Sequence, residues 1–397
     1  MARAHRVDIL ILGGGIAGLW ILHTLRREGY DAWLIDRGPL GDAQTVRSQG
    51  ILHRGGKYLL DPRRAHHGHG FPDLLPRWQA CLDGDGEIDL HKVPVRSPGP
   101  WIWSREPYPA HLLDRLSPAR QTRRVVPGTA PPALRRRRDL LRLEEPVLDM
   151  PRLLEALADG HPDRCLESAS GELRAEARGG EIQVHDAGSP ELPPIRARAT
   201  ILAAGAGNEG LLRQLRCRRP AMVRRPLRMV VATGPALPPL WLHAVADGVG
   251  PSFTITSHGT GAGGTLWYLG GDLSEEGAHR DPRDLCAEAR ERVRGELPHL
   301  DLEGARWASL AVERAEPRLP AGRRKLEPFV HQEGSLLVVW PSKMVFAPLV
   351  GDRVLEHLRG LGLPRGDGGS GQGSAAAPGW PGARPAPLPW PGPEMEL

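Results

Sequence analysis

Three glycines and one acid near the amino terminus are spaced as in sites that hold a diphosphate and the adjoining sugar. Gly13, Gly15 and Gly18 form a G-x-G-x-x-G motif. In such a motif the first glycine permits a tight turn, the second lets a diphosphate approach the backbone, and the third lets a helix lie close to a strand. Asp36 follows at roughly the 20-residue offset at which a carboxylate hydrogen-bonds a ribose hydroxyl. These residues predict a dinucleotide site, and the acid favours FAD or NAD over NADP.

The flanking sequence predicts the elements that such a site requires. The aliphatic run 7–12 is typical of a strand buried on both faces. Apolar residues recur at helical spacing over 16–25, and the run 32–35 predicts a second buried strand that ends at Asp36. Glycine makes up 49 of the 397 residues, so the motif alone can arise by chance. Its place between a strand and a helix favours dinucleotide binding.

A second informative segment, 47–58, combines small residues with one histidine and one lysine, which suits a chain that passes beneath a flat ring. Its notable positions are Ser48, Gly50, His53 and Gly56. On these residues the chain resembles the D-amino-acid-oxidase-like flavoproteins, a superfamily that includes glycine and sarcosine oxidases, FAD-linked glycerol-3-phosphate dehydrogenase and 2-hydroxyglutarate dehydrogenase. In those proteins the matching segment contacts the pyrophosphate and the isoalloxazine of FAD.

The resemblance implies an α/β fold, with a Rossmann-type FAD-binding domain and an inserted antiparallel-sheet (α+β) substrate domain. The length of the chain also predicts two domains, since a single core stops growing below this size. Beyond residue 363 the sequence is rich in Gly, Ser, Ala and Pro, which predicts disorder. We expect an FAD-binding domain over 1–60, 148–215 and 327–362, a substrate domain over 61–147 and 216–326, and a disordered tail over 363–397.

Two further segments resemble FAD contacts of the superfamily. A buried strand over 195–202 enters a run of tiny residues, 203–207, which lets the strand end approach the dinucleotide. The loop 341–348 matches one that presents N–H groups to flavin N1 and O2, where negative charge accumulates on reduction. It contains Lys343, one of only four lysines among 52 basic residues. Leu173 is the candidate backbone contact to adenine. The predicted FAD-binding residues are Gly13, Gly15, Ile16, Ala17, Gly18, Asp36, Arg37, Ser48, Gln49, Gly50, Leu173, Ala204, Gly205, Lys343, Met344 and Val345.

The candidate catalytic residues are His53, Lys343 and Tyr268. Because an imidazole titrates near neutral pH, His53 can orient or deprotonate a substrate, or it can hydrogen-bond the cofactor without catalysis. We expect His53, Tyr268, Arg314 and Arg318 to bind the substrate, because tyrosine and arginine hold carboxylates. The resemblance implies an FAD-dependent oxidoreductase, either an oxidase or a dehydrogenase. It would oxidise a small amine or hydroxy acid by hydride transfer to flavin N5, with oxygen, a quinone or a protein as electron acceptor.

Other features of the sequence argue against several classes of protein. The four cysteines are far apart and no secretory signal is evident, so we expect reduced thiols and a cytoplasmic location. His66, His67 and His69 have no acidic or cysteine partner nearby, and we expect no metal site. The sequence contains no apolar run of about 18 residues, so we expect no membrane span. No second dinucleotide motif follows a strand, so we expect no separate NAD(P)H site.

Two alternative functions remain open from the sequence. The arginines at 135–138 and 213–228 suggest an RNA-modifying flavoenzyme. However, no aromatic residues lie among the arginines of 135–138 to stack on bases, and the net charge is only +5, so we do not expect nucleic acid as a partner. The second alternative is a flavin-binding subunit that performs no turnover.

Overall fold

A computed structural model of the chain describes residues 3–54, 72–104, 122–124, 129–135, 140–245, 251–260, 263–319, 327–365 and 379–390. The predictions that concern Gly56, Lys57 and the histidines at 66, 67 and 69 therefore lie outside the described residues. The same holds for three of the four arginines at 135–138. Among the described residues, no helix is both long enough and apolar enough to cross a membrane.

The first sheet is built around the strand that precedes the glycine motif. Its order is β17-β18-β11-β1-β2-β8, with β10 and β9 added beside β11. β1 pairs in parallel with both β11 and β2, so the carboxyl ends of these strands meet at one edge. β11 also pairs in parallel with β18, and β2 with β8. The strands are β1 His5–Leu12, β2 Ala32–Asp36, β8 Cys165–Glu167, β9 Leu173–Arg178, β10 Glu181–Asp186, β11 Ile195–Leu202, β17 Phe329–Glu333 and β18 Leu336–Trp340.

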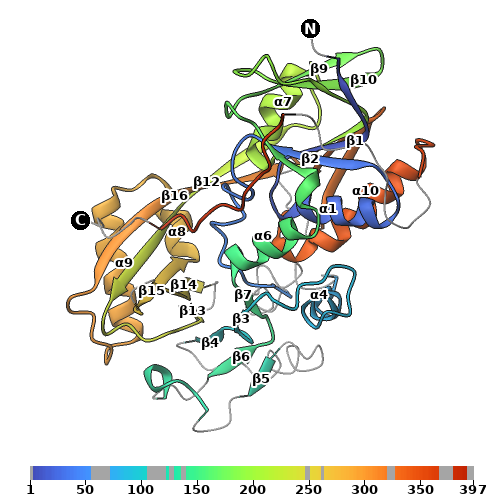
Figure 1. Cartoon of the computed structure of the whole chain (residues 1–397). Coiled ribbons are helices and arrows are strands. Elements are labelled where there is room, and N and C mark those ends of the chain that lie inside the picture. The colour runs from blue at the N-terminus through green and yellow to red at the C-terminus, as the bar shows by residue number, and fades with distance from the viewer. Residues whose placement is uncertain are drawn as a thin grey trace.

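Both faces of β1 are buried, as its aliphatic sequence predicts. Ile9 and Ile11 belong to a core that also contains residues of four helices. Leu10 and Leu12, which alternate with them, belong to a second core on the other face. Figure 1 shows the helices α1 and α10 lying side by side against the sheet. The helices are α1 Ile16–Arg27, α4 Leu75–Leu82, α6 Met150–Asp159, α7 Asn208–Gln214, α8 Asp272–Glu276, α9 Pro282–Glu296 and α10 Ala347–Arg359.

The second sheet has the order β16-β12-β15-β14-β13-β4-β6-β5 and is antiparallel except where β4 pairs in parallel with β13. Val230 and Ala232 of β12 pack with residues of α9, whereas Met229 and Val231 belong to a cluster on the opposite face. Figure 1 shows α8 and α9 on the outer side of this sheet. Its strands are β4 Trp101–Ser104, β5 Thr122–Arg124, β6 Leu141–Leu143, β12 Met222–Gly234, β13 Leu242–Val245, β14 Pro251–Gly259, β15 Thr265–Gly270 and β16 Arg306–Pro317. A separate pair joins β3 Val95–Ser97 to β7 Val147–Leu148.

The prediction of a wholly disordered tail is wrong for residues 379–390. The Leu40 N–H donates to the Arg384 carbonyl and the Ala386 N–H to the Leu40 carbonyl, so this segment pairs with the chain just after β2. The buried Trp380 packs in the core of the first sheet and Trp390 packs on the second. Figure 1 shows this dark red segment running from the first sheet toward the second. The two tryptophans bury apolar surface that the average composition of the tail does not reveal.

Candidate functional site

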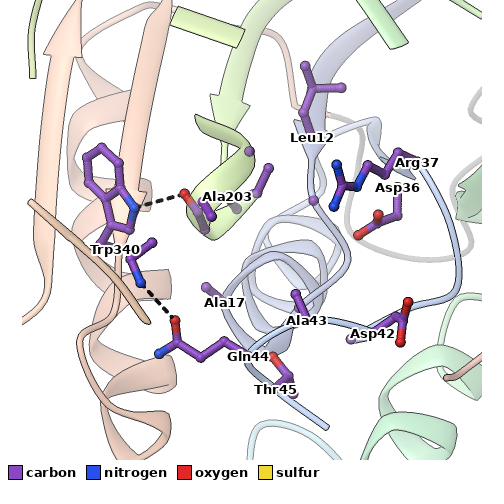
Figure 2. A pocket seen from close by; sticks show the side chains of 18 of the residues that line it. Leu12, Ala17, Asp36, Arg37, Asp42, Ala43, Gln44, Thr45, Ala203 and Trp340 are labelled. Carbon is purple, nitrogen blue, oxygen red and sulfur yellow. Dashed lines mark hydrogen bonds between the residues drawn. The ribbon is translucent and has the colours of Figure 1, made fainter. Parts of the chain in front are cut away.

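A cavity of about 640 Å³ opens at the carboxyl edge of the first sheet. Its walls come from the end of β1, the start of α1, the end of β2 and the segment after β11, together with β12 and β16 of the second sheet. Figure 2 shows Leu12, Ala17, Asp36 and Ala203 around it. Cavities of roughly 300–1,000 Å³ are typical of cofactor sites, and the carboxyl edge of a parallel sheet is where such sites lie.

One part of the cavity is a turn of backbone at the start of α1. Gly13 has a φ of +115°, and a Cβ there would lie 2.5 Å from the Ala204 backbone. A Cβ on Gly18 would lie 1.9 Å from the Gly13 carbonyl oxygen, so only glycine lets the helix lie this close. The helix begins after Gly15, which has no side chain to cap it. Its first N–H groups and the helix dipole therefore make this end of the cavity suited to a diphosphate.

The predicted sugar-binding acid also lines the cavity. Asp36 accepts hydrogen bonds from the N–H groups of Gly14 and Gly38. Burial raises the pKa of this carboxyl, although the N–H groups of Gly14, Gly38 and Arg37 act in the opposite direction. Figure 2 shows Asp36 and Arg37 together at one side of the cavity. Leu173, the candidate adenine contact, lines the cavity as well.

The opposite part of the cavity is formed by the loop that follows β18. Lys343 and Met344 line it, as do the unpredicted Trp340 and Ser342. The Trp340 indole donates a hydrogen bond of 3.1 Å to the Gly205 carbonyl, which Figure 2 shows. Ser342 has a φ of +65°, a left-handed conformation that glycine adopts more readily.

Of the predicted FAD-binding residues, Gly18, Gln49, Gly50 and Val345 do not line the cavity. The Gln49 amide donates to the carbonyls of Thr254 and Tyr268, which ties the segment after β2 to the second sheet. A Cβ on Gly50 would lie 2.5 Å from the Leu148 carbonyl oxygen. The Val345 carbonyl accepts a hydrogen bond from the Trp78 indole. These four residues contact neighbouring segments of the chain and not the cavity itself. The other predicted residues, Gly13, Gly15, Ile16, Ala17, Asp36, Arg37, Ser48, Leu173, Ala204, Gly205, Lys343 and Met344, all line the cavity.

The structure does not bring the predicted substrate-binding arginines to the cavity. On β16, Glu313 and Ala315 line the cavity, and Arg314 lies between them. Because side chains alternate along a strand, Arg314 points to the other face, where it pairs with Glu275 at 2.8 Å. Arg318 is exposed beyond the end of β16. Neither arginine is therefore placed to contact a ligand in this cavity, and their role in substrate binding stays a prediction.

Tyr268 is likewise placed away from the cavity. Its side chain is fully buried, and its hydroxyl donates a 2.8 Å hydrogen bond to the Arg47 carbonyl. The ring of Trp390 lies 4.6 Å from the Tyr268 ring and 4.9 Å from that of His258, measured between centroids. Burial raises the pKa of Tyr268 well above its usual range. This tyrosine joins the tail and the segment after β2 to the second sheet, and a catalytic role for it stays a prediction.

His53 lies in a cluster with Glu145 and His243 that the sequence did not predict. His53 Nδ1 is 2.9 Å from Glu145 Oε2, and the two imidazole rings lie 6.3 Å apart between centroids. Glu145 and His243 are fully buried, whereas the His53 side chain keeps 19% exposure. His53 is not among the residues that line the large cavity, but it lies on the same segment as Ser48, which does.

Comparisons with known proteins give the family. A family model described as FAD dependent oxidoreductase matches residues 8–352. The chain belongs to this family of oxidoreductases. It is 40% identical over 370 residues to PA4991 of Pseudomonas aeruginosa, named a probable FAD-dependent oxidoreductase, with 91% of this chain and 93% of that protein covered. The crystal structure of PA4991 matches with a TM-score of 0.80 and 37% identity over 98% of each chain.

More distant solved structures share the fold of this oxidoreductase. L-α-glycerophosphate oxidase from Mycoplasma pneumoniae matches with a TM-score of 0.63 and 15% identity, covering 96% of this chain and 99% of that one. Glycine oxidase from Geobacillus kaustophilus matches with a TM-score of 0.60 and 17% identity, covering 91% and 97%. None of these names describes RNA modification or a subunit without turnover, so the comparisons lend no support to either alternative function.

The cofactor of this oxidoreductase is FAD, and the residues present fit it. The turn at the start of α1 carries no side chain, so a diphosphate can approach the N–H groups of the helix. A Cβ on Gly13 would lie 2.5 Å from the Ala204 backbone, so this turn requires glycine. It also has a carboxylate at the end of β2, placed for a ribose hydroxyl.

Sequence reasoning missed several polar residues of the cavity wall. Thr45 accepts a hydrogen bond from the Ile16 N–H, and Gln44 accepts one from the Ala315 N–H, as Figure 2 shows for Gln44. Arg224 of β12 also lines the cavity, where it pairs with Glu209 and Glu313. No local motif marks these residues. Only Thr45 and Gln44 carry a weak signal, because they immediately precede the predicted segment 47–58.

Proposed function

We propose that this oxidoreductase oxidises a small amine or hydroxy acid, with hydride transfer to N5 of FAD. The observation that carries the proposal is one segment of chain. It leaves the nucleotide cavity at Ser48 and reaches His53 five residues later, where a buried carboxylate holds the imidazole. When bound, FAD supplies the hydride acceptor. The protein then has to place the substrate carbon, and to take a proton from the oxygen or nitrogen that this carbon bears.

The two sheets suggest a division of labour between the predicted domains. We propose that the first sheet and its helices hold FAD, and that the second sheet covers the flavin end and supplies the substrate pocket. The second sheet already contributes Arg224 and Glu313 to the wall of the cavity. Residues 61–147 contribute β4, β5 and β6 to this sheet, which is why we assign them to the substrate side.

Three residues have proposed roles around the reacting groups. His53 binds the substrate and takes its proton, because it is the imidazole on the segment that leaves the cavity. Lys343 lines the flavin end of the cavity, where a cation would stabilise the negative charge that builds up near N1 and O2 on reduction. Asp36 holds the ribose. Reoxidation by oxygen, a quinone or a protein completes the cycle.

Anaerobic reduction of the bound flavin tests the proposal. Purified holoenzyme is mixed with a panel of amino acids, N-substituted amino acids and 2-hydroxy acids, and the visible flavin band is followed. We expect either the amino compounds or the 2-hydroxy acids to bleach the band, and the other class to leave it unchanged. Dithionite serves as the control that the flavin is reducible. A band that dithionite bleaches and that no compound of the panel bleaches would contradict the proposed substrate class.

A further inference from the structure

We propose that Glu145 is a positioning residue that fixes His53 in one tautomer, so that His53 Nε2 is the nitrogen that takes the substrate proton. The inference rests on the proposed function for its role in turnover, but it can be tested without a substrate. It assigns a role to a buried acid that stands 92 residues away from the histidine in sequence.

The hydrogen bonds around Glu145 define what each atom does. Its Oε2 lies 2.9 Å from His53 Nδ1, and its Oε1 accepts a 2.8 Å hydrogen bond from the Arg54 N–H. Both carboxylate oxygens are therefore engaged by consecutive residues of one segment. This arrangement fixes the direction of the imidazole ring as well as its distance, because rotation about its side-chain bonds would break the contact at Nδ1.

The hydrogen bonds that Glu145 accepts from His53 and from the Arg54 N–H favour its ionised form. Burial alone would raise the pKa of this carboxyl, but the adjacent His53, the more distant His243 and the Arg54 N–H outweigh burial and lower the pKa to about 2. An ionised carboxylate can only accept hydrogen bonds. The proton shared with Glu145 therefore belongs to His53 Nδ1, and in the neutral ring the basic lone pair is on Nε2.

Other polar side chains lie next to the pair. His243 of β13 lies beside the pair, and its Nδ1 forms a hydrogen bond of 2.7 Å with the Thr254 hydroxyl. The Arg54 guanidinium, which follows His53 in sequence, is bound by Asp73 and lies 3.6 Å from Glu144.

The step that this geometry supports is balanced with respect to protons and electrons. The substrate O–H or N–H proton would pass to His53 Nε2, and the hydrogen of the substrate C–H bond would leave with both bonding electrons as hydride. Bound FAD would supply the two-electron acceptor, so the substrate carbon would be oxidised as the flavin is reduced. The imidazolium that results is stabilised by the Glu145 carboxylate at Nδ1, which is the role of the acid in acid–histidine pairs generally.

A metal ion is the competing interpretation of the same three side chains. Ligand atoms of His53, Glu145 and His243 lie within 4.8 Å of one another, and two histidines with one carboxylate form a familiar ligand set. The hydrogen bonds favour the proton-relay interpretation. His53 Nδ1 and Glu145 Oε2 face each other at 2.9 Å, which is a direct hydrogen-bond distance.

Nitrogen NMR of histidine-labelled holoenzyme tests the tautomer directly. The His53 signals are assigned by their loss in His53→Gln. We expect a ring protonated at Nδ1 in the unaltered enzyme, and a mixture of tautomers in Glu145→Gln, because a side-chain amide can both donate and accept. Glu87→Gln is the matched control: Glu87 is an acid with 11% side-chain exposure that pairs with Arg77, away from this cluster. It should leave the His53 signals unchanged.

Rates of flavin reduction complete the test once a substrate is known. Glu145→Gln should lower the rate by about 100-fold or more, shift its pH profile and leave FAD binding intact. The proposal is overturned if His53 is protonated at Nε2 in the unaltered enzyme, or if Glu145→Gln reduces flavin at an unchanged rate. It is also overturned if one equivalent of a metal ion copurifies and its removal shifts the His53 and His243 signals. If no substrate reduces the flavin at all, the proposed function fails while the tautomer result still stands.

Discussion

The nucleotide cavity is formed largely by backbone groups, whereas the His53 cluster is formed by side chains. At the start of α1 the cavity is backbone: glycines, a helix terminus and tiny residues, with one carboxylate at the end of a strand. The cluster is made of side chains that three separate segments supply, namely the segment after β2, the loop before β7 and strand β13. In the proposed function the cavity holds FAD, a cofactor that many enzymes share, whereas the cluster acts on the substrate.

This difference determines how each region should respond to mutation. A backbone site fails when any Cβ intrudes, and the change affects folding and FAD binding together. A side-chain cluster can lose one group and keep its shape, so the change should affect rate and proton transfer more than folding. The following predictions test that contrast, from the largest expected effect to the smallest.

The largest effect is expected for Gly13→Ala. The added Cβ would lie 2.5 Å from the Ala204 backbone at a φ of +115° that an alanine rarely adopts. We expect protein without bound FAD, or no folded protein, measured by the ratio of flavin to protein absorbance and by thermal unfolding. Gly295→Ala in α9 is the control, since a Cβ there meets nothing within 4 Å. FAD retained at a normal ratio in Gly13→Ala would contradict the backbone account of the cavity.

The tail offers a test that compares the two sheets within one segment. Trp380 is 7% exposed in the core of the first sheet, and its indole donates to the Pro193 carbonyl. Trp380→Ala should cost about 3 kcal/mol of unfolding free energy. Trp390 is only partly buried against Tyr268, so Trp390→Ala should cost less. Denaturant titration measures both values. Equal and negligible costs would show that the tail does not bind either sheet.

A moderate, pH-dependent effect is expected at Asp36. The ionised carboxylate accepts hydrogen bonds from ribose hydroxyls, and burial raises its pKa above the usual carboxyl range. Protonation removes the acceptor, so FAD affinity should fall as the pH drops through this raised pKa, earlier than an exposed aspartate would predict. Asp36→Asn should weaken FAD by about 1.5–3 kcal/mol and flatten this pH dependence. Fluorescence of released FAD gives the affinity, and a variant that retains the full pH dependence would assign it to another group.

The smallest effect is expected at Ser342. Its left-handed φ of +65° costs roughly 1–2 kcal/mol for a residue with a Cβ, and glycine removes that cost while adding entropy to the unfolded chain. Ser342→Gly should therefore raise the unfolding free energy by less than about 1 kcal/mol. Ser252→Gly, in the strand β14, should lower it instead. Thermal unfolding compares the two variants, and the same sign in both would mean that the strain at Ser342 is not relieved by glycine.

The elements of the cavity were predictable because their signals are local. The helix α6 illustrates this: Asp149 caps it by accepting from the Arg152 N–H, Pro151 lies in its first turn and Gly160 ends it, and these residue types at these positions are local signals of a helix. The substrate side was less predictable. The apolar residues cluster at 229–232, whereas β12 runs over Met222–Gly234, because pairing with β16 sustains it through Pro226. The direction of Arg314 depends on the register of β16, which no local motif marks.

The sequence by itself determined the strand–turn–helix that receives the diphosphate, the acid that follows it and the family to which the chain belongs. Each depends on residues that are neighbours along the chain, because glycine positions and the spacing of apolar residues can be read from the sequence directly. Only the tertiary structure decided that Glu145 meets His53, that Trp390 covers Tyr268 and that Arg314 turns away from the cavity. Those contacts join distant segments, and the packing of two sheets brings them within hydrogen-bond or van der Waals distance.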